Sequence, residues 1–185
     1  MRRIITSVIL SLDGRMEGPG GAGDLDWTAP FVDDLLAYSV ELLSSATGGI
    51  LLGRTTYEGF RTYWPFQEGE LADLMNTPPK HVFSRSGALP DPSWGEYDNA
   101  RLVGDEQVGE LKRRAGSDLV VLASGRLAAS LLAQGAVDEA QCLVLPTVLG
   151  AGRSHLSGIA GPVHFEFAGT RRYPGGAVLL AHRPL

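Results

Sequence analysis

The sequence predicts an α/β fold with a mainly parallel central sheet that ends in an antiparallel C-terminal hairpin. Three observations predict this fold. Short apolar segments rich in β-branched residues alternate with amphipathic stretches of helical period. Two of these segments run through a Gly-Arg pair directly into a helix. The last two strand segments are separated by a short turn, which makes them antiparallel.

The first element is an apolar strand over residues 4–12, which ends at the turn signal Asp13-Gly14. A loop rich in glycine follows over residues 14–27, and its glycines indicate backbone that moves or lies against a ligand. Thr28 can cap the next helix, in which apolar residues recur at helical spacing over residues 31–42.

A short strand over residues 50–52 then leads through Gly53 and Arg54 into a second helix. Thr55 or its neighbour Thr56 can cap this helix. Glu58 follows at roughly the spacing that a capping box requires. We therefore expect the first helical turn to be closed by its own side chains.

Four short elements are expected in the middle of the chain. They are a helix over residues 71–76, strands over residues 80–85 and 100–103, and a mostly polar helix over residues 105–115.

The stretch 119–132 predicts a buried parallel strand that runs directly into a helix. Its first four residues are an apolar run too short for a helix, and leucines then recur at helical spacing up to residue 132. Gly125 gives the turn its backbone freedom, and Ser124 can cap the helix. The first helical N–H groups lack intrahelical partners, so this junction predicts an anion site with Arg126 beside it.

The C-terminal part of the chain adds three strands. A strand over residues 140–146 is followed by a loop over residues 147–154, and strands over residues 164–172 and 177–183 are joined by a turn over residues 173–176. The two junctions at Gly53-Arg54 and Gly125-Arg126 suggest that two parts of the chain bind one polyphosphate ligand. Either junction alone would be weak evidence for such a ligand.

Length and composition restrict the class of protein. We expect residues 1–185 to form a single domain, and the 44% hydrophobic and 20% charged composition is that of an ordinary globular protein. A net charge of −5 argues against nucleic acid as a partner. No apolar run reaches the length of a membrane span, and Asp13-Gly14 interrupts the N-terminal apolar stretch too early for a signal peptide. A cytoplasmic location is therefore expected.

Several motifs have plainer interpretations. Cys142 lies in an apolar run and is expected to be a buried packing residue, and no metal site is expected because the four histidines are scattered without ligand spacing. The segment 18–23 matches the letters of a dinucleotide fingerprint but follows no strand directly, so it is interpreted as a flexible loop. The residues around Ser124 lack the first glycine of a hydrolase nucleophile elbow.

In their order along the chain, several short motifs resemble the dihydrofolate-reductase-like superfamily, and more closely the reductase domain of the bifunctional riboflavin-biosynthesis deaminase-reductase and its stand-alone relatives. The resemblance covers nearly the whole chain. The motifs are Ser11-Leu-Asp-Gly14, Leu52-Gly-Arg-Thr-Thr-Tyr57, Val82-Phe-Ser-Arg85, Ala123-Ser-Gly-Arg126, Asp138-Glu139 before the strand that ends at Pro146, and Leu149-Gly-Ala-Gly152.

This resemblance implies a dihydrofolate-reductase-like three-layer fold and an oxidoreductase that uses NADPH. It implies that Ser84 and Arg85 hold the adenosine 2′-phosphate and that Met16 lies near the nicotinamide. The residues implied to hold the pyrophosphate and the nearby phosphate are Gly53, Arg54, Thr55, Ser124, Gly125, Arg126 and Leu127.

The chain departs from the folate reductases at the substrate end. Those enzymes carry an acid five residues after a tryptophan, but counting from Trp27 that position is Val32, with Asp33 one residue later. One helical position rotates a side chain by about 100°, so Asp33 is a poor substitute. Asp13 is the better candidate to orient substrate or relay a proton through water, and Trp27 is a candidate apolar wall. Within these 185 residues no His/Cys zinc signature of the deaminase type is found, so a deaminase half is not expected here.

The leading hypothesis is hydride transfer from NADPH to a small heterocyclic or ribosylated substrate, most like that of 5-amino-6-(5-phosphoribosylamino)uracil reductase in riboflavin biosynthesis. Two alternatives stay open, namely residual dihydrofolate reduction and a nucleotide-binding module without catalysis. The apolar run Val178-Leu-Leu-Ala181 is consistent with a homodimer, and a buried hairpin explains it equally well.

Overall fold

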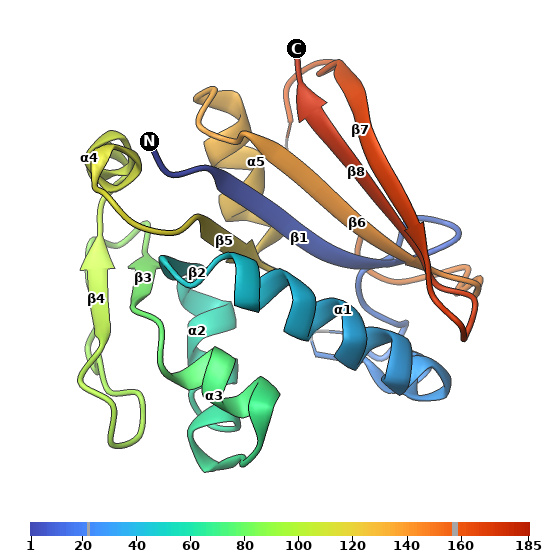
Figure 1. Ribbon diagram of the computed structural model, residues 1–185, viewed down its shortest axis with the longest axis horizontal. Helices are drawn as coiled ribbons and strands as arrows, with labels where there is room; N and C mark the ends of the chain where they lie inside the picture. Colours follow the sequence, from blue (N-terminus) through green and yellow to red (C-terminus); the bar gives the residue numbers. More distant parts are fainter. Residues whose placement is uncertain (22, 157–158) are drawn as a thin grey trace.

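The computed structural model describes residues 1–21, 23–156 and 159–185. Within these residues the chain forms one eight-stranded sheet with the order β4-β3-β2-β5-β1-β6-β8-β7 (Figure 1). The strands are β1 (Ile4–Ser11), β2 (Gly49–Gly53), β3 (Lys80–Phe83), β4 (Ala100–Val103), β5 (Leu119–Leu122), β6 (Glu139–Leu145), β7 (Phe165–Arg172) and β8 (Val178–Pro184). Strands β1 to β6 pair in parallel, whereas β8 pairs antiparallel with β6 and β7. The predicted fold class is therefore confirmed.

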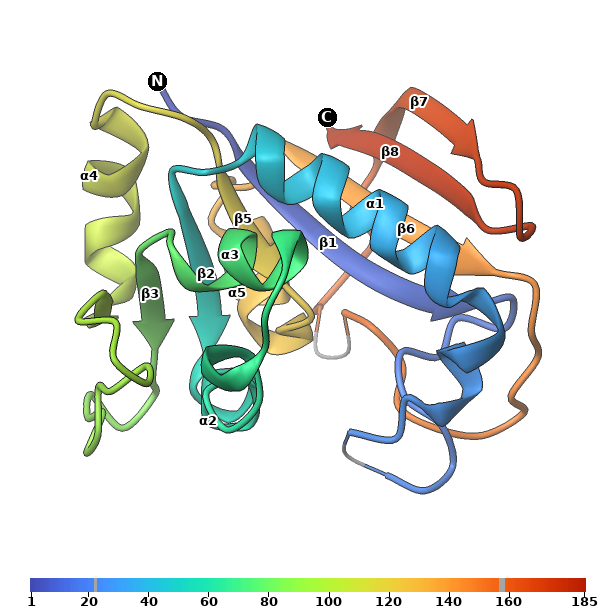
Figure 2. The same ribbon diagram turned by 60° about the horizontal axis from the view of Figure 1, so that its bottom comes forward.

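Helices cover both faces of this sheet, as Figures 1 and 2 show from two directions. Side chains of α1, α2 and α3 pack on one face, and side chains of α4 and α5 pack on the other. The helices are α1 (Val32–Ser45), α2 (Arg54–Phe60), α3 (Glu70–Asn76), α4 (Val108–Arg113) and α5 (Gly125–Ala133), with short 3₁₀ helices η1 (Asp26–Phe31), η2 (Trp64–Phe66) and η3 (Asp105–Gln107). None of the helices in the described ranges has the length and apolar character needed to span a membrane.

The two hydrophobic cores follow from the period of the strands. Because successive strand residues point to opposite faces, Ile4 belongs to the core under α4 and α5, and Ile5 belongs to the core under α1 and α3. Strands β2 and β5 are buried on both faces, as expected for parallel strands between two helical layers. This double burial fixes where β2 and β5 end, and their carboxyl ends position the candidate site.

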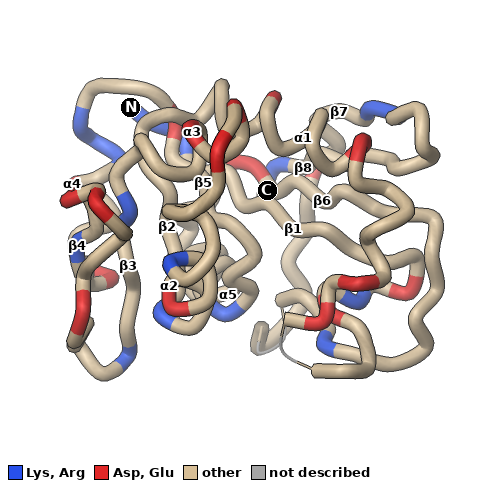
Figure 3. Tube along the Cα trace, turned by 90° about the horizontal axis from the view of Figure 1, so that it is seen from below, with Lys and Arg blue, Asp and Glu red and all other residues tan. Residues whose placement is uncertain are grey.

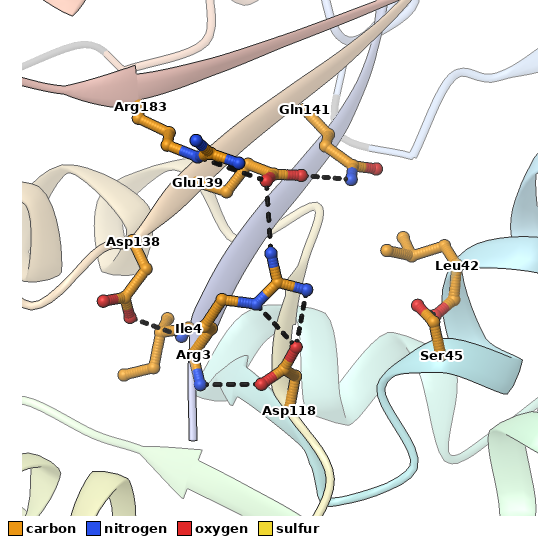
Figure 4. A network of polar contacts seen from close by, with 9 residues as sticks. All are labelled: Arg3, Ile4, Leu42, Ser45, Asp118, Asp138, Glu139, Gln141 and Arg183. Carbon is orange, nitrogen blue, oxygen red and sulfur yellow. Dashed lines mark hydrogen bonds and ion pairs between the residues drawn. The ribbon is translucent and has the colours of Figure 1, made fainter. Parts of the chain in front are cut away.

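The amino ends of the strands are held together by ion pairs (Figure 4). Arg3, just before β1, pairs with Asp118 before β5 at 2.7 Å and with Glu139 at the start of β6 at 3.4 Å. Asp138 accepts the backbone N–H of Ile4 at 2.7 Å and pairs with Lys112 at 2.6 Å. The charges at this edge are thus matched by neighbouring charges of opposite sign.

The C-terminal hairpin is attached to α1 by a buried carboxylate. Asp34 in the first turn of α1 accepts the backbone N–H groups of Gly175 and Ala177, at 2.8 and 3.0 Å. Two hydrogen bonds to a carboxylate compensate for its burial. Asp34 therefore anchors the turn between β7 and β8.

Element positions agree with the sequence prediction, but two capping predictions are wrong. Thr28 lies inside η1, where its hydroxyl donates to the carbonyl of Leu25 at 2.8 Å, so it does not cap α1. Gly53 occupies the N-cap position of α2 without a side-chain cap, which leaves Thr55 and Thr56 inside the helix. Glu58 pairs with Arg54 and forms no capping box.

Residues 18–21 and 23 of the glycine-rich segment belong to no helix or strand, and the next element is η1 from Asp26; Ala22 lies outside the described residues. Asp24 braces this loop, because its carboxylate accepts the Gly20 N–H at 2.8 Å. The described residues of this segment agree with its interpretation as a loop.

Candidate functional site

The two strand-Gly-Arg-helix junctions lie side by side. Strands β2 and β5 are parallel neighbours, so Gly53-Arg54 and Gly125-Arg126 emerge at the same edge of the sheet. The backbone N–H of Gly53 donates to the buried hydroxyl of Ser124 at 2.9 Å. Figure 2 shows α2 continuing directly from the end of β2, with β5 next to it. The expected convergence of the junctions is confirmed.

The second junction is a tight turn that exposes the start of α5. Ala123 adopts a positive φ of 55°, and the N–H of Ser124 donates to the carbonyl of Leu122 at 2.5 Å. Ser124 is the N-cap residue as predicted, but no side-chain cap bond forms, because its hydroxyl accepts from Gly53. The first N–H groups of this nine-residue helix therefore remain available to a ligand.

Leu127 can contribute only its backbone to this end of α5. Its side chain is 8% exposed and packs in the core between α5 and the sheet. Arg126 points the other way and is exposed, and it forms no ion pair with any residue that the structure describes.

The first junction is more strongly tied to its own helix. Helix α2 has seven residues, and Arg54 at its start pairs with Glu58 at 2.7 Å. A second nitrogen of Arg54 donates to the hydroxyl of Ser86 at 3.4 Å, which links this junction to the segment after β3. Thr55 is exposed in the first turn.

A third cation completes this edge of the sheet. Ser84 and Arg85 follow β3, the parallel neighbour of β2, and the hydroxyls of Ser84 and Ser86 lie 2.9 Å apart. Arg85 and Arg126 both line a groove of about 830 Å³, whose other walls are one face of α5 and residues 159–163. Seen from below, the chain carries blue segments beside α2 and α5 (Figure 3). The edge thus combines open helix N–H groups with exposed arginines.

Met16 of the glycine-rich loop lies at the start of α5. It is 7% exposed, and its Sδ atom lies 3.6 Å from the position that a Cβ on Gly125 would occupy. Its backbone N–H donates to the carbonyl of Arg153 at 2.9 Å. The structure therefore brings Met16 to the second junction through contacts with the loop before β7.

His155 is a residue at this site that sequence reasoning missed. Its Nδ1 atom lies 3.2 Å from the position of a Cβ on Gly125, is buried, and has no hydrogen-bond partner among the described residues. Its side chain is only partly exposed, and it was assigned no role from the sequence beyond the absence of metal-ligand spacing among the histidines. The only sequence signal near it is the preceding motif Gly150-Ala-Gly152, which indicates a tight loop.

Asp13 follows β1 and holds the loop that begins after β6. Its carboxylate accepts the N–H groups of Leu149 and Gly150 at 3.0 and 2.9 Å and the hydroxyl of Ser11 at 2.7 Å. The bond from the Leu149 N–H, followed by those from Ser11 and Gly150, lowers the pKa of Asp13 to about 2. This carboxyl group is therefore ionised at neutral pH and carries no proton to donate.

Trp27 lies in η1, just before α1. It is half-buried and packs against the core on the α1 side of the sheet, as an apolar wall would. Its indole Nε1 atom is buried and has no hydrogen-bond partner in the described part of the chain. No described contact joins Trp27 to the two junctions.

The remaining candidates for chemistry are few. The described residues contain no group of three or more His, Cys, Asp or Glu side chains able to hold a metal ion. Cys142 on β6 is a free thiol of intermediate burial, less buried than the packing residue that was expected. Burial still raises its pKa, which makes it a poor nucleophile.

Comparison with known proteins identifies relatives over nearly the whole chain. The model of the RibD C-terminal domain matches residues 2–179. A Bacillus subtilis protein named YyaP, which is uncharacterized, is 29% identical over 190 residues that cover 98% of this chain and 94% of that protein.

Solved structures share the fold at low sequence identity. A protein from Shewanella sp. PV-4 described as a riboflavin biosynthesis protein superposes with a TM-score of 0.74 and 18% identity over 99% of each chain. The TM-score is 0.71 and the identity 17% with a Thermotoga maritima diaminohydroxyphosphoribosylaminopyrimidine deaminase/5-amino-6-(5-phosphoribosylamino)uracil reductase. That superposition covers the whole of this chain and 57% of the Thermotoga chain. Dihydrofolate reductase from Enterococcus faecalis, complexed with NADP(H), superposes with a TM-score of 0.64 and 13% identity. That superposition covers 98% of this chain and 96% of the reductase chain.

Proposed function

The chain belongs to the RibD C-terminal domain family, and we propose that it is an NADPH-dependent reductase acting on a C=N or C=O bond of a small heterocyclic or ribosylated substrate. The substrate most like its own is that of 5-amino-6-(5-phosphoribosylamino)uracil reductase, the activity named for the Thermotoga relative. The observation that carries the proposal is the hydrogen bond from the Gly53 N–H to the Ser124 hydroxyl. It holds the two proposed anion-binding junctions next to each other, so that one ligand can contact both.

In this proposal the phosphates lie along the edge formed by β3, β2 and β5. The pyrophosphate contacts the first N–H groups of α5 and the guanidinium groups of Arg126 and Arg54, with Gly53 and Thr55 beside them. The 2′-phosphate lies between Ser84 and Arg85, which supports a preference for NADPH over NADH. The groove of about 830 Å³ between Arg85 and Arg126 is large enough for the adenosine end.

NADPH, when bound, supplies a hydride to the substrate carbon, and the acceptor nitrogen or oxygen takes a proton. The protein would position and shield these groups: Met16 would lie beside the nicotinamide, and Trp27 would form an apolar wall. Asp13 is a positioning residue that keeps residues 149–150 against the end of β1. Because its pKa is about 2, Asp13 is not itself the proton donor in this proposal and would at most orient a water molecule that carries the proton.

Two binding and assay measurements test the proposal. Titration with NADPH should change nucleotide fluorescence and raise Tm, since a ligand that binds the folded state stabilises it. NADPH should then be oxidised with a member of a panel of ribosylaminopyrimidines, pterins and carbonyl compounds. The absence of NADPH binding would contradict the cofactor assignment.

The same panel separates the alternatives. Oxidation of NADPH only with dihydrofolate would favour a dihydrofolate reductase, although Val32 and Asp33 are both exposed in the first turn of α1. Binding of NADPH without oxidation by any compound would favour a nucleotide-binding module that has lost the chemistry.

We also propose that the protein is a homodimer that uses its C-terminal hairpin. Val178, Leu179 and Leu180 on β8 are only partly buried, and Phe167 on the edge strand β7 is 65% exposed. Such an apolar edge is typical of a surface that pairs with another copy. Light scattering should give twice the mass of one chain, and the mass of a single chain would contradict the dimer.

A further inference from the structure

His155 places an imidazole nitrogen at the N-terminus of α5. Its Nδ1 atom lies 3.2 Å from where a Cβ on Gly125 would be, closer than the Met16 Sδ atom at 3.6 Å. The backbone nitrogen of the next residue, Leu156, lies at 3.7 Å from the same point. A loop distant in sequence thus brings a side chain with hydrogen-bonding capacity to the start of α5, next to Arg126, which lines the groove.

This nitrogen atom is buried without compensation. Nδ1 has no hydrogen-bond partner among the described residues, and leaving a buried polar atom unpaired is unfavourable. The neighbouring atoms are a thioether, a glycine and the helix start, none of which satisfies it. An unpaired polar atom next to a helix N-terminus is the arrangement expected when the missing partner is a ligand.

The charges around His155 favour an anionic partner. Arg153 lies on the same loop, and Arg126 follows Gly125 on α5. Arg153 is also paired with Glu17, with its Nε atom 2.7 Å from Oε2. Burial, and then the charge of Arg153, lower the pKa of His155 to about 4. The imidazole is therefore neutral in the free protein, and an anion beside it would favour the protonated form.

We propose that His155 is an additional ligand of the cofactor pyrophosphate and that it takes up a proton when the phosphate occupies the start of α5. This inference rests on the proposed function. The protonated ring donates from Nδ1, alongside the open N–H groups of α5 and the guanidinium of Arg126. Since a proton is taken up on binding, affinity for the cofactor falls as pH rises.

The test is calorimetric titration of the full-length protein with NADP⁺ between pH 5.5 and 8, in two buffers of different ionisation enthalpy so that protons are counted. The 2′-phosphate also titrates near pH 6, so each variant is compared with wild type, and the ligand's own contribution cancels. His155→Ala should bind about tenfold more weakly at pH 6, the loss of one charge-assisted hydrogen bond. His155→Asn, which keeps a donor, should recover part of the affinity without the proton uptake.

The control is His164→Gln, at an exposed position just before β7, which should match wild type in both affinity and proton count. Melting curves confirm that each variant folds. Equal or tighter NADP⁺ binding by His155→Ala, or unchanged proton uptake in His155→Asn, would overturn the inference and leave the proposed function intact. If wild type binds no NADP⁺ or NADPH, the proposed function itself fails.

Discussion

The amino and carboxyl edges of the parallel sheet carry the same kinds of charged residue but differ in how these are paired. At the amino edge, Arg3 contacts Asp118 at 2.7 Å and Glu139 at 3.4 Å. At the carboxyl edge, Arg85 and Arg126 form no ion pair with any residue in the described ranges. Pairing therefore separates arginines that hold strands together from arginines that are free to bind an anion.

Arg54 is intermediate between these two cases. It lies at the carboxyl edge, yet it is paired with Glu58 at 2.7 Å one helical turn along α2. Exposed pairs at this spacing contribute only about 0.3–0.5 kcal/mol, so a phosphate can take Arg54 from its partner at small cost. The comparison between the edges thus ranks the arginines by how readily each can bind a phosphate.

The largest effect is expected at Arg126. Arg126→Ala should weaken NADP⁺ binding about 10- to 100-fold, because it removes a charge-assisted bond to phosphate, and should leave Tm unchanged in the absence of ligand. Calorimetric titration and melting curves measure the two effects. Arg3→Ala is the matched control, which should lower Tm and keep the affinity for NADP⁺. If Arg126→Ala instead lowered Tm and Arg3→Ala weakened NADP⁺ binding, the difference drawn between the two edges would be wrong.

Arg85→Ala should act on one cofactor only. Without the guanidinium, affinity for NADPH should fall about tenfold, the value of one charge-assisted hydrogen bond. Affinity for NADH, which lacks the 2′-phosphate, should stay the same. Fluorescence titration with both nucleotides gives the ratio, and an equal loss for NADPH and NADH would remove the role assigned to Arg85.

Ser124→Ala tests the bond that joins the two junctions. Loss of the hydroxyl leaves the Gly53 N–H without its partner, and the free energy of unfolding should fall by about 1–2 kcal/mol. Urea denaturation measures this change. Ser124→Thr keeps a hydroxyl and should retain part of the stability, whereas equal stability of Ser124→Ala and wild type would show that the junctions are not coupled through this bond.

The smallest effect is expected at Arg54. Because Arg54 is already shared with Glu58, Arg54→Ala should weaken NADP⁺ binding by only about threefold, less than 1 kcal/mol. Glu58→Gln, which releases Arg54 from its pair, should leave affinity unchanged or slightly higher. If Arg54→Ala weakened NADP⁺ binding as much as Arg126→Ala does, ion pairing would not explain which arginines bind the phosphate.

Sequence reasoning located most of what local pattern determines. The strands, the helices and both Gly-Arg junctions follow from periodicity within about a dozen residues. Their convergence could be expected because parallel strands end at the same edge, and the hydrogen bond of Gly53 with Ser124 agrees with it.

The parts that the sequence did not predict depend on contacts between distant segments. Ser124 was expected to cap its own helix, but its hydroxyl is used by Gly53, 71 residues earlier. Thr28 could not be excluded as a cap without knowing that η1 precedes α1. His155 carries no pattern at all, since its burial depends on the packing of its loop against Gly125 and Met16.

A crystal structure of the protein with bound NADP⁺ tests the account most directly. It should show the pyrophosphate between Gly53 and Gly125, in contact with Arg126, and the 2′-phosphate beside Ser84 and Arg85. A nucleotide bound elsewhere, with the carboxyl ends of β2 and β5 unoccupied at saturating concentration, would contradict it.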